Sequence, residues 1–428
     1  MSPELFHDSG YGTVTDLETR LMWMRCPSGQ TWLGQRCIGV AHGYGWLETK
    51  QYADKLLAPK PFTPGEDPVP VSGKVLTSED FTSLVDSSLD GWLTAGRFTV
   101  DFERALANFV GTRHALFVNS GSSANLVALS GLTSKKLGER ALNPGDEVLY
   151  PNPGYPIYES QIEYFGGIAK PYRYIANGNG FSIDIDQIKS LITPRTKAIV
   201  YNDLQNPNGA ESTDAEREAI AEIAIANDLY VLSDEAYFEM RYEGKSKSIA
   251  SIPGMAERTV ILYTFSKKFA MTGWRLGAAI APKEIADVIS KLNTNDESCT
   301  THFVQYGGVE AVTGDQSGVP VMLNTLKQRR DTALELLRQM PGVKVHTPEA
   351  GFYLFPDVTE AMANKGITDL GDFAQQALHA TGVSFCTRRH FGRPQEGEKE
   401  QYIRLAFSGI DNSEISDGLK FMGEWIAE

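Results

Sequence analysis

The sequence is short of cysteines, of long apolar runs and of basic residues, and each shortage argues against a class of protein. Four cysteines in 428 residues cannot form a disulfide framework, so we expect a reducing compartment. No run of about 18 apolar residues is present, which argues against a membrane span or a membrane partner. The net charge of −14 argues against nucleic acid as a partner, because no basic stripe would offset phosphate repulsion.

The beginning and the length of the sequence give two further expectations. The first residues, MSPELFHDSG, lack the basic and apolar regions of a signal peptide, and we therefore expect a cytoplasmic protein. A chain of 428 residues can hold two domains and bury a substantial core. The cysteines show no CxxC spacing, so no metal site is expected.

The most informative pattern is YTFSKKFAMTGWRLG, residues 263–277. Lys267 follows an apolar run that predicts a buried strand. Nearby stand the hydroxyls of Thr264 and Ser266 and the guanidinium of Arg275. Such a set suits a carbonyl cofactor with a phosphate, because the amine can form a Schiff base while the other groups hold the dianion. Taken alone, the segment also fits a surface Lys-Lys pair after an ordinary strand.

Two upstream segments carry polar residues at the ends of apolar runs. Asp234 ends the run in LYVLSDEAY, with Tyr237 three residues on, and Asn206 lies in NPNG just after AIVYND. The ordered set resembles the signature of class I/II aminotransferases, pyridoxal-phosphate enzymes with the aspartate aminotransferase fold (fold type I): Asn206, Asp234, Tyr237, Lys267 and Arg275. The resemblance extends from about Pro151 to the C-terminus.

The resemblance implies a role for each residue toward the cofactor, pyridoxal 5′-phosphate (PLP). Lys267 would hold PLP as an internal aldimine and, once released by the substrate amine, move a proton between Cα and C4′. Asp234 would face the pyridine nitrogen and keep it protonated, so that the ring accepts electrons. Asn206 and Tyr237 would hydrogen-bond the 3-oxygen of the ring.

Residues 93–147 resemble a different branch of the same fold, the DegT-type sugar aminotransferases and sugar 3-dehydrases, through GRFTVDFERALANFVGTRHALFVNSGSSANLVALSGLTS. Here the strand ALFV is followed by a turn of small and hydroxyl residues: Asn119, Ser120, Gly121, Ser122, Ser123 and Ala124. Backbone N–H groups at such a helix N-terminus can approach a phosphate, with the hydroxyls as added donors. A plain Ser-rich helix cap fits the same residues. The sugar 3-dehydrases carry a histidine at the lysine position, so Lys267 argues against their chemistry.

Two further residues complete the predicted site. Tyr155, in PNPGYPIYES, matches the family position whose ring stacks on the pyridine face, with Tyr158 as an alternative. Arg404, in YIRLAFS, matches the family arginine that grips the substrate α-carboxylate, a task that suits the bidentate geometry of a guanidinium. Three nearby residues could either read a substrate side-chain carboxylate or cap a solvated loop: Arg388, Arg389 and His390.

Strands alternate with helices through the middle of the chain. TKAIVYND, LYVLSD, TVILYTF and GAAIAP read as buried strands, and Thr213 with Glu216 predicts a capping box that opens the helix TDAEREAIAEIAIAND. This alternation predicts an α/β fold, a three-layer sandwich with a mostly parallel central sheet and ligands at the carboxyl ends of its strands. A smaller α+β domain follows, in which TLKQRRDTALELLRQ reads as a helix and PEAGFYLFPDV and YIRLAFSGI as strands.

The sequence divides into four predicted parts. Residues 1–58 form a β-rich appendage, in which YGTVTDLETRLMWMRCPSGQTW resembles the start of the DUF1566 family, and residues 59–92 form a proline-rich linker or arm. Residues 93–315 form the PLP-binding domain, and residues 316–428 form the small C-terminal domain.

The appendage has two open interpretations. It could be a binding or dimer-covering module, or a decorative extension recruited by gene fusion. Its two cysteines, Cys26 and Cys37, could pair across a turn, although no secretion signal favours a disulfide.

Together these patterns predict a cytoplasmic, homodimeric, PLP-dependent aminotransferase that moves an amino group between an amino acid and a 2-oxo acid through Lys267. The same cofactor residues serve other fold-type I enzymes, so a lyase, decarboxylase or oxidase acting on an amino acid is an alternative, as is a sugar aminotransferase. A non-catalytic PLP-binding protein is a third class, which turnover with any amino donor would exclude.

Overall fold

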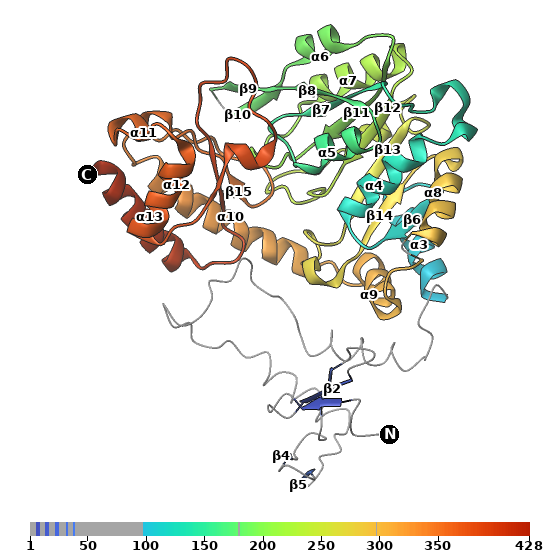
Figure 1. The fold of residues 1–428 in the computed structure, drawn as a ribbon, viewed down its shortest axis with the longest axis horizontal. Helices are drawn as coiled ribbons and strands as arrows, with labels where there is room; N and C mark the ends of the chain where they lie inside the picture. The colour runs from blue at the N-terminus through green and yellow to red at the C-terminus, as the bar shows by residue number, and fades with distance from the viewer. Residues whose placement is uncertain are drawn as a thin grey trace. The chain divides into compact units, whose positions relative to one another are not determined.

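The computed structural model describes residues 97–428, apart from residues 179 and 297, together with five short strands nearer the N-terminus. The chain divides into two compact units, Met1–Thr63 with Leu76–Ser83 and Pro64–Val75 with Leu84–Glu428. The second unit holds two lobes, a larger one built around a central sheet and a smaller one built around the C-terminal helices (Figure 1).

In the first unit, the described residues form short antiparallel strands. Their bounds are Phe6–Asp8 (β1), Thr13–Asp16 (β2), Met22–Met24 (β3), Thr31–Trp32 (β4) and Cys37–Ile38 (β5). Strands β1, β2 and β3 form one sheet, and β4 pairs with β5. Whether Cys26 pairs with Cys37, which the sequence left open, lies outside the described side chains.

Seven strands form the central sheet of the larger lobe, in the order β6-β14-β13-β12-β11-β7-β8. Their bounds are Ala115–Val118 (β6), Glu147–Pro151 (β7), Ile168–Tyr172 (β8), Thr196–Asn202 (β11), Tyr230–Asp234 (β12), Thr259–Thr264 (β13) and Gly277–Ile280 (β14). Strand β14 runs antiparallel to both of its neighbours, and the other pairs are parallel. The predicted α/β fold with a mostly parallel sheet is confirmed.

Helices cover both faces of this sheet (Figure 1). Their bounds are Arg97–Val110 (α3), Gly121–Leu132 (α4), Ile157–Tyr164 (α5), Ile185–Leu191 (α6), Asp214–Ala226 (α7), Lys283–Asn295 (α8) and His302–Thr313 (α9). Successive residues of one strand point to opposite faces. Thus Leu262 packs with side chains of α4 and α8, whereas Ile261 packs with side chains of α3 and α9. Helices α6 and α7 cover the other half of that second face.

The predicted capping box at the start of α7 is confirmed. The Glu216 backbone N–H donates to Thr213 Oγ1 at 3.2 Å, and the Thr213 backbone N–H donates to Glu216 Oε2 at 2.7 Å. Both groups would otherwise be unpaired donors at a helix N-terminus, so this exchange defines where α7 begins.

The smaller lobe combines four helices with a three-stranded sheet of order β15-β17-β16. Their bounds are Gly318–Leu337 (α10), Tyr353–Leu354 (β15), Thr359–Asn364 (α11), Leu370–Thr381 (α12), Cys386–Thr387 (β16), Ile403–Ala406 (β17) and Asn412–Ala427 (α13). The strands β15 and β17 are shorter than the sequence pattern suggested. Leu204 and Tyr237, from loops of the larger lobe, join the core of this lobe beside Phe373 and Met422.

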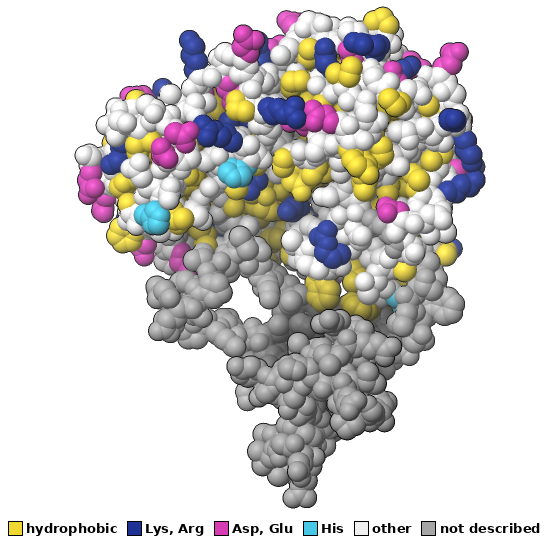
Figure 2. Space-filling model, in the orientation of Figure 1, with side chains coloured by type: hydrophobic (Ala, Val, Ile, Leu, Met, Phe, Trp, Pro, Cys, Tyr) yellow, Lys and Arg dark blue, Asp and Glu magenta, His cyan; other side chains and the backbone are white. Residues whose placement is uncertain are grey.

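The remaining elements are short. A hairpin pairs Tyr174–Asn177 (β9) with Gly180–Ile183 (β10), and the 3₁₀ helices are Lys135–Arg140 (η2), Ile249–Ser251 (η3), Thr272–Trp274 (η4) and Arg388–Phe391 (η5). On the face shown in Figure 2, hydrophobic side chains gather between the two lobes, and charged side chains of both signs are dispersed over the rest of the described surface.

The reversed strand β14 has a consequence for chemistry. The carboxyl ends of parallel strands meet at one edge of a sheet, so Lys267, which follows β13, lies at that edge. Because β14 is antiparallel, it begins at the same edge, with Gly277 opposite Thr264. Arg275, just before β14, is thereby brought to the edge that carries Lys267.

Candidate active site

A cavity of about 330 Å³ lies at the carboxyl edge of the sheet, where the larger lobe meets the smaller one. Of the thirteen residues predicted from the sequence, twelve line it: Ser120, Gly121, Ser122, Tyr155, Asn206, Asp234, Tyr237, Thr264, Ser266, Lys267, Arg275 and Arg404. The remaining one, Ser123, stands just behind. Its hydroxyl donates to Asn119 Oδ1 at 2.7 Å, and its backbone N–H donates to Oγ of Ser120, the N-cap of α4, at 3.0 Å. Ser123 is therefore bound into the first turn of α4.

The two adjacent lysines have different surroundings. Lys267 lines the cavity, with its Nζ 5.7 Å from the ring centre of Tyr237 and 5.4 Å from that of Phe352. Burial lowers the pKa of the Lys267 amine below its ordinary value, and the nearby Arg404 guanidinium lowers it further. Lys268 is 7 % exposed and forms an ion pair with Glu239. Lys267 is therefore the amine available to a carbonyl compound in the cavity.

Asp234, at the end of β12, is the acidic residue of the cavity wall. Tyr158 donates to its Oδ2 at 2.6 Å, and the Ala236 backbone N–H donates to its Oδ1 at 3.1 Å. Burial raises the pKa of the Asp234 carboxyl, while the hydrogen bonds from Tyr158 and Ala236 oppose that rise. A cation placed against this carboxylate would offset the burial cost, which is what a protonated pyridine nitrogen provides.

Two tyrosines were candidates for stacking on the cofactor ring. Tyr158 is fully buried and its hydroxyl is bonded to Asp234. Tyr155 lines the cavity with 37 % of its surface exposed, and its hydroxyl lies 3.4 Å from Ser122 Oγ. This arrangement favours Tyr155 for stacking and leaves Tyr158 to orient Asp234.

Donors suited to a phosphate gather at the start of α4. Ser120 is the N-cap in an extended conformation, and a Cβ on Gly121 would lie 3.2 Å from the Thr264 Cβ, so glycine allows a close approach. The hydroxyls of Thr264 and Ser266 lie 3.0 Å apart beside this turn.

Arg275 supplies the charge at this end. Its φ of 62° places it in the left-handed region, and its Nη1 donates to the Thr272 carbonyl at 3.1 Å. No carboxylate of the described residues forms an ion pair with it. A guanidinium without an acidic partner, beside a helix N-terminus and hydroxyls, matches a phosphate dianion. The residues present therefore fit the phosphate of PLP.

Arg404, on β17, occupies the opposite end of the cavity. Its Nη1 donates to Asn206 Oδ1 at 2.8 Å, and its guanidinium carbon lies 4.1 Å from the ring centre of Tyr353 and 4.7 Å from that of Phe391. Its Nε is buried without a hydrogen-bond partner among the described residues. The rings fix the plane of the guanidinium and leave donors for an anion such as a carboxylate.

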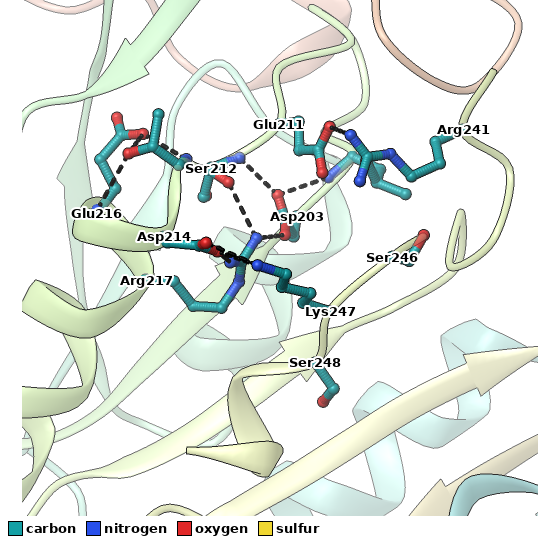
Figure 3. Close-up of polar contacts among 12 residues, drawn as sticks. Asp203, Glu211, Ser212, Asp214, Glu216, Arg217, Arg241, Ser246, Lys247 and Ser248 are labelled. Carbon is teal, nitrogen blue, oxygen red and sulfur yellow. Dashed lines mark hydrogen bonds and ion pairs between the residues drawn. The ribbon is translucent and has the colours of Figure 1, made fainter. Parts of the chain in front are cut away.

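Asp203, three positions before Asn206 in the sequence, forms a buried ion pair with Arg217 (Figure 3). Asp203 Oδ2 accepts from Arg217 Nη2 at 3.2 Å, and its Oδ1 accepts from the backbone N–H groups of Leu204 and Ser212 at 3.0 and 2.8 Å. Leu204 has a φ of 53°, which is costly for a leucine, so this conformation needs external support. Asn206 follows two residues after Leu204, so these contacts support the loop from which Asn206 accepts the hydrogen bond of Arg404.

The three basic residues of η5 have hydrogen-bond or ion-pair partners outside the cavity. Arg388 is 3 % exposed and donates to Glu398 and, at 2.7 Å, to Asn152 Oδ1. The guanidinium of Arg389 is paired with Asp369. His390 Nδ1 accepts from the Thr387 backbone N–H at 3.1 Å. None of the three lines the cavity. The sequence left open whether they bind a substrate carboxylate or stabilise their own loop, and the structure favours stabilisation of the loop.

The cavity is also lined by residues that were not predicted as part of the site, among them Asn125, Asn202 and Tyr353. Asn125 lies one helical turn after Gly121, and its Nδ2 donates to the Gly121 carbonyl at 3.0 Å. Asn202 Nδ2 donates to the Asp234 backbone carbonyl at 3.0 Å. Helical spacing could have indicated Asn125, but nothing in the sequence marks Tyr353.

Comparisons with known proteins agree with this geometry. The family Aminotransferase class I and II matches residues 93–421. The chain is similar to the asparagine–oxo-acid transaminase of Streptococcus mutans (36% identical over 269 residues, 62% of this chain and 67% of that protein). It is also similar to an aspartate aminotransferase of Sulfolobus acidocaldarius (32% over 348 residues, 79% of this chain and 84% of that protein). The solved aromatic aminotransferase of Pyrococcus horikoshii superposes with a TM-score of 0.73 at 25% identity, covering 83% of this chain and 94% of that one.

Proposed function

The chain belongs to the class I and II aminotransferases, which use PLP, and we propose that Lys267 is the residue through which it moves an amino group between an amino acid and a 2-oxo acid. The observation that carries this assignment is the convergence of Lys267, Asp234, Arg275 and Arg404, from four separate segments, on one cavity. Each of these side chains has a distinct chemical task there.

The cofactor would be held at both ends of its ring. Its phosphate would meet the N-terminus of α4 and the guanidinium of Arg275, assisted by hydroxyls and small residues of the same cavity wall: Ser120, Gly121, Ser122, Thr264 and Ser266. Ser123 would support this wall from behind as part of the first turn of α4. The ring would lie between Asp234 and Tyr155, with Asn206 and Tyr237 near its 3-oxygen.

Bound PLP supplies an electron sink for the negative charge that develops at the substrate Cα. The carboxylate of Asp234 would keep a proton at the pyridine nitrogen. Lys267 Nζ, whose pKa is lowered by burial and by Arg404, would accept the Cα proton and return it. Arg404 would bind the α-carboxylate between the Tyr353 and Phe391 rings and thereby orient the Cα–H bond toward Lys267.

The experiment is a panel of amino acids mixed with the purified, PLP-loaded protein, with product masses measured in the presence of a 2-oxo acid. Transfer of nitrogen from donor to oxo acid supports the assignment. Release of carbon dioxide, ammonia or a β-substituent without amino transfer would instead favour a decarboxylase, oxidase or lyase. An amino sugar that reacts better than every amino acid would favour the sugar-acting alternative suggested by residues 93–147.

Three further proposals concern the whole molecule. The resemblance to dimeric aminotransferases supports a homodimer, and the small number of cysteines, four in 428 residues, supports a reducing compartment such as the cytoplasm. No helix of the described residues is long and apolar enough to span a bilayer. Residues 1–58 would be a DUF1566-like appendage outside the catalytic unit, joined through residues 59–92. Light scattering of the purified protein measures the oligomeric state directly.

A further inference from the structure

Tyr353 lines the cavity and contacts two residues of the predicted site, Tyr237 and Arg404. It is 9 % exposed, stands on β15 and belongs to the smaller lobe. The Tyr237 hydroxyl donates to the Tyr353 hydroxyl at 3.0 Å. Tyr353 also contacts Arg404 through its ring, whose centre lies 4.1 Å from the guanidinium carbon.

The hydrogen bond between the two phenols raises the question of which acceptor receives the Tyr237 proton when the cofactor is bound. Each hydroxyl has one proton, so Tyr237 cannot donate to Tyr353 and to a cofactor oxygen at the same time. An anionic ring oxygen is a stronger acceptor than a neutral phenol, because hydrogen bonds to charged groups are about twice as strong. When PLP is bound, Tyr237 should therefore turn its proton to the cofactor. Tyr353 has no other hydrogen-bond acceptor among the described residues, so its own proton is then free for the Tyr237 oxygen.

We propose that Tyr353 is a positioning residue for the transamination site: its hydroxyl donates to Tyr237 and strengthens the Tyr237 hydrogen bond to the cofactor, while its ring holds Arg404 in place for the substrate carboxylate. This inference rests on the proposed function of Lys267, Tyr237 and Arg404. The arrangement forms a chain of donors that runs from Tyr353 through Tyr237 to the ring oxygen. Such chains strengthen each member, because donating a proton makes a hydroxyl oxygen a better acceptor.

The charged and titratable groups around this pair are few. Tyr237 faces Asp234 and Arg404, and Lys267 faces these two and Arg275. Tyr353 itself faces Arg404, Tyr155 and Cys386. None of these is altered by a substitution that removes only the Tyr353 hydroxyl.

The consequence is measurable in the visible spectrum of the PLP-loaded protein. A hydrogen bond to the ring oxygen stabilises its negative charge, so the nitrogen joining Lys267 to the cofactor holds its proton less tightly. Removing the Tyr353 hydroxyl weakens that bond. In Tyr353→Phe we expect the pH midpoint of the visible band to rise by about half a unit to one unit, the size of one lost hydrogen bond.

The two contacts of Tyr353 can be separated by two substitutions. Tyr353→Phe keeps the ring beneath Arg404, so the KM for amino acids should stay within about twofold of wild type. Tyr353→Leu removes the ring as well, and the KM should rise by about tenfold. Tyr242→Phe is the matched control. Like Tyr237, Tyr242 comes from a loop of the larger lobe, and its hydroxyl donates to the smaller lobe, at the Gly351 carbonyl. Tyr242 does not line the cavity, so removing its hydroxyl should leave the midpoint unchanged.

A double-mutant cycle tests whether Tyr353 acts through Tyr237. Tyr237→Phe should raise the midpoint by more than Tyr353→Phe, and adding Tyr353→Phe to Tyr237→Phe should change it no further. An unchanged midpoint in Tyr353→Phe, or a lowered one, overturns the inference, since the latter would make Tyr353 a competitor for the Tyr237 proton. Additive shifts in the double variant overturn it as well. If the wild-type protein shows no visible band on loading, the proposed function itself fails, so the two failures are distinguishable.

Discussion

The two ends of the cavity are built in different ways. The end that suits the phosphate comes entirely from the larger lobe and from two short sequence segments, 119–124 and 264–275, with hydroxyls, backbone N–H groups and one guanidinium as donors. The end that suits the carboxylate joins the two lobes, since Arg404 on β17 bonds Asn206, 198 positions earlier, between aromatic rings. Cofactor binding and substrate binding therefore depend on different residues, and a substitution at one end should weaken one without weakening the other.

The largest effect is expected where the two ends meet. Lys267→Ala should abolish nearly all turnover and prevent covalent attachment of the cofactor, because no other amine lines the described part of the cavity. Lys268→Ala is the matched control. It breaks the ion pair with Glu239 and should lower the melting temperature while retaining the attachment. Borohydride reduction and peptide mapping locate the label, and a label on Lys268 would contradict the assignment.

The second largest loss of activity is expected for Asp234→Asn. The amide keeps the shape of the site and the cofactor should still bind, but a neutral group cannot hold the pyridinium proton, and the rate should fall by several orders of magnitude. The assay is the single-turnover rate with a saturating amino donor. Activity within about tenfold of wild type, a loss of only about 1.4 kcal/mol, would exclude a role at the ring nitrogen.

The sequence could predict the end built from local segments better than features that depend on packing between distant segments. The phosphate end depends on local patterns, in which a strand is followed by small and hydroxyl residues, and six of its seven predicted residues line the cavity, all but Ser123. Arg404, at the other end, was predicted from the family resemblance and not from a local pattern. Three features depend on tertiary packing and left no local pattern. These are the reversal of β14, the Tyr158–Asp234 hydrogen bond and the position of Tyr353. The basic residues of η5 were ambiguous because their partners, such as Glu398 and Asp369, are set by loop geometry.

At the carboxylate end, Arg404→Leu should raise the KM for amino acids far more than it weakens PLP binding. Losing a charge-assisted pair in a poorly hydrated site should cost about 2–4 kcal/mol of substrate binding, roughly a thirtyfold to thousandfold change. Spectral titration with amino acids, and with an amine lacking the carboxylate, measures this. Arg389→Leu is the control, because Arg389 lies in the same lobe but pairs with Asp369 outside the cavity. Equal binding by wild type and Arg404→Leu would make Arg404 structural.

At the phosphate end, Arg275→Leu should show the opposite selectivity. One charge-assisted contact to the phosphate is worth about 1.5–3 kcal/mol, so the Kd for PLP should rise roughly tenfold to a hundredfold. At saturating PLP the KM for the amino acid should stay close to that of wild type, because Arg404 is unchanged. Equilibrium dialysis gives the Kd. A raised KM with unaltered PLP affinity would reverse the roles of the two arginines and break the comparison.

The smallest effect is expected from deletion of residues 1–57. All the described residues of the cavity wall lie at or after Ser120, so neither end of the cavity draws on this segment within the part of the chain that the structure describes. The chain also separates Met1–Thr63, with Leu76–Ser83, as a compact unit of its own, so the truncation removes most of one unit and spares the other. The Kd for PLP and the rate of the half-reaction with an amino donor should stay within about twofold of the full chain, a change below about 0.5 kcal/mol.

Circular dichroism and light scattering serve as controls for the folding and assembly of the truncated protein. A truncated protein that folds and assembles normally, yet loses PLP affinity, would assign the segment to the phosphate end. One that keeps PLP but shows a raised KM would assign it to the carboxylate end.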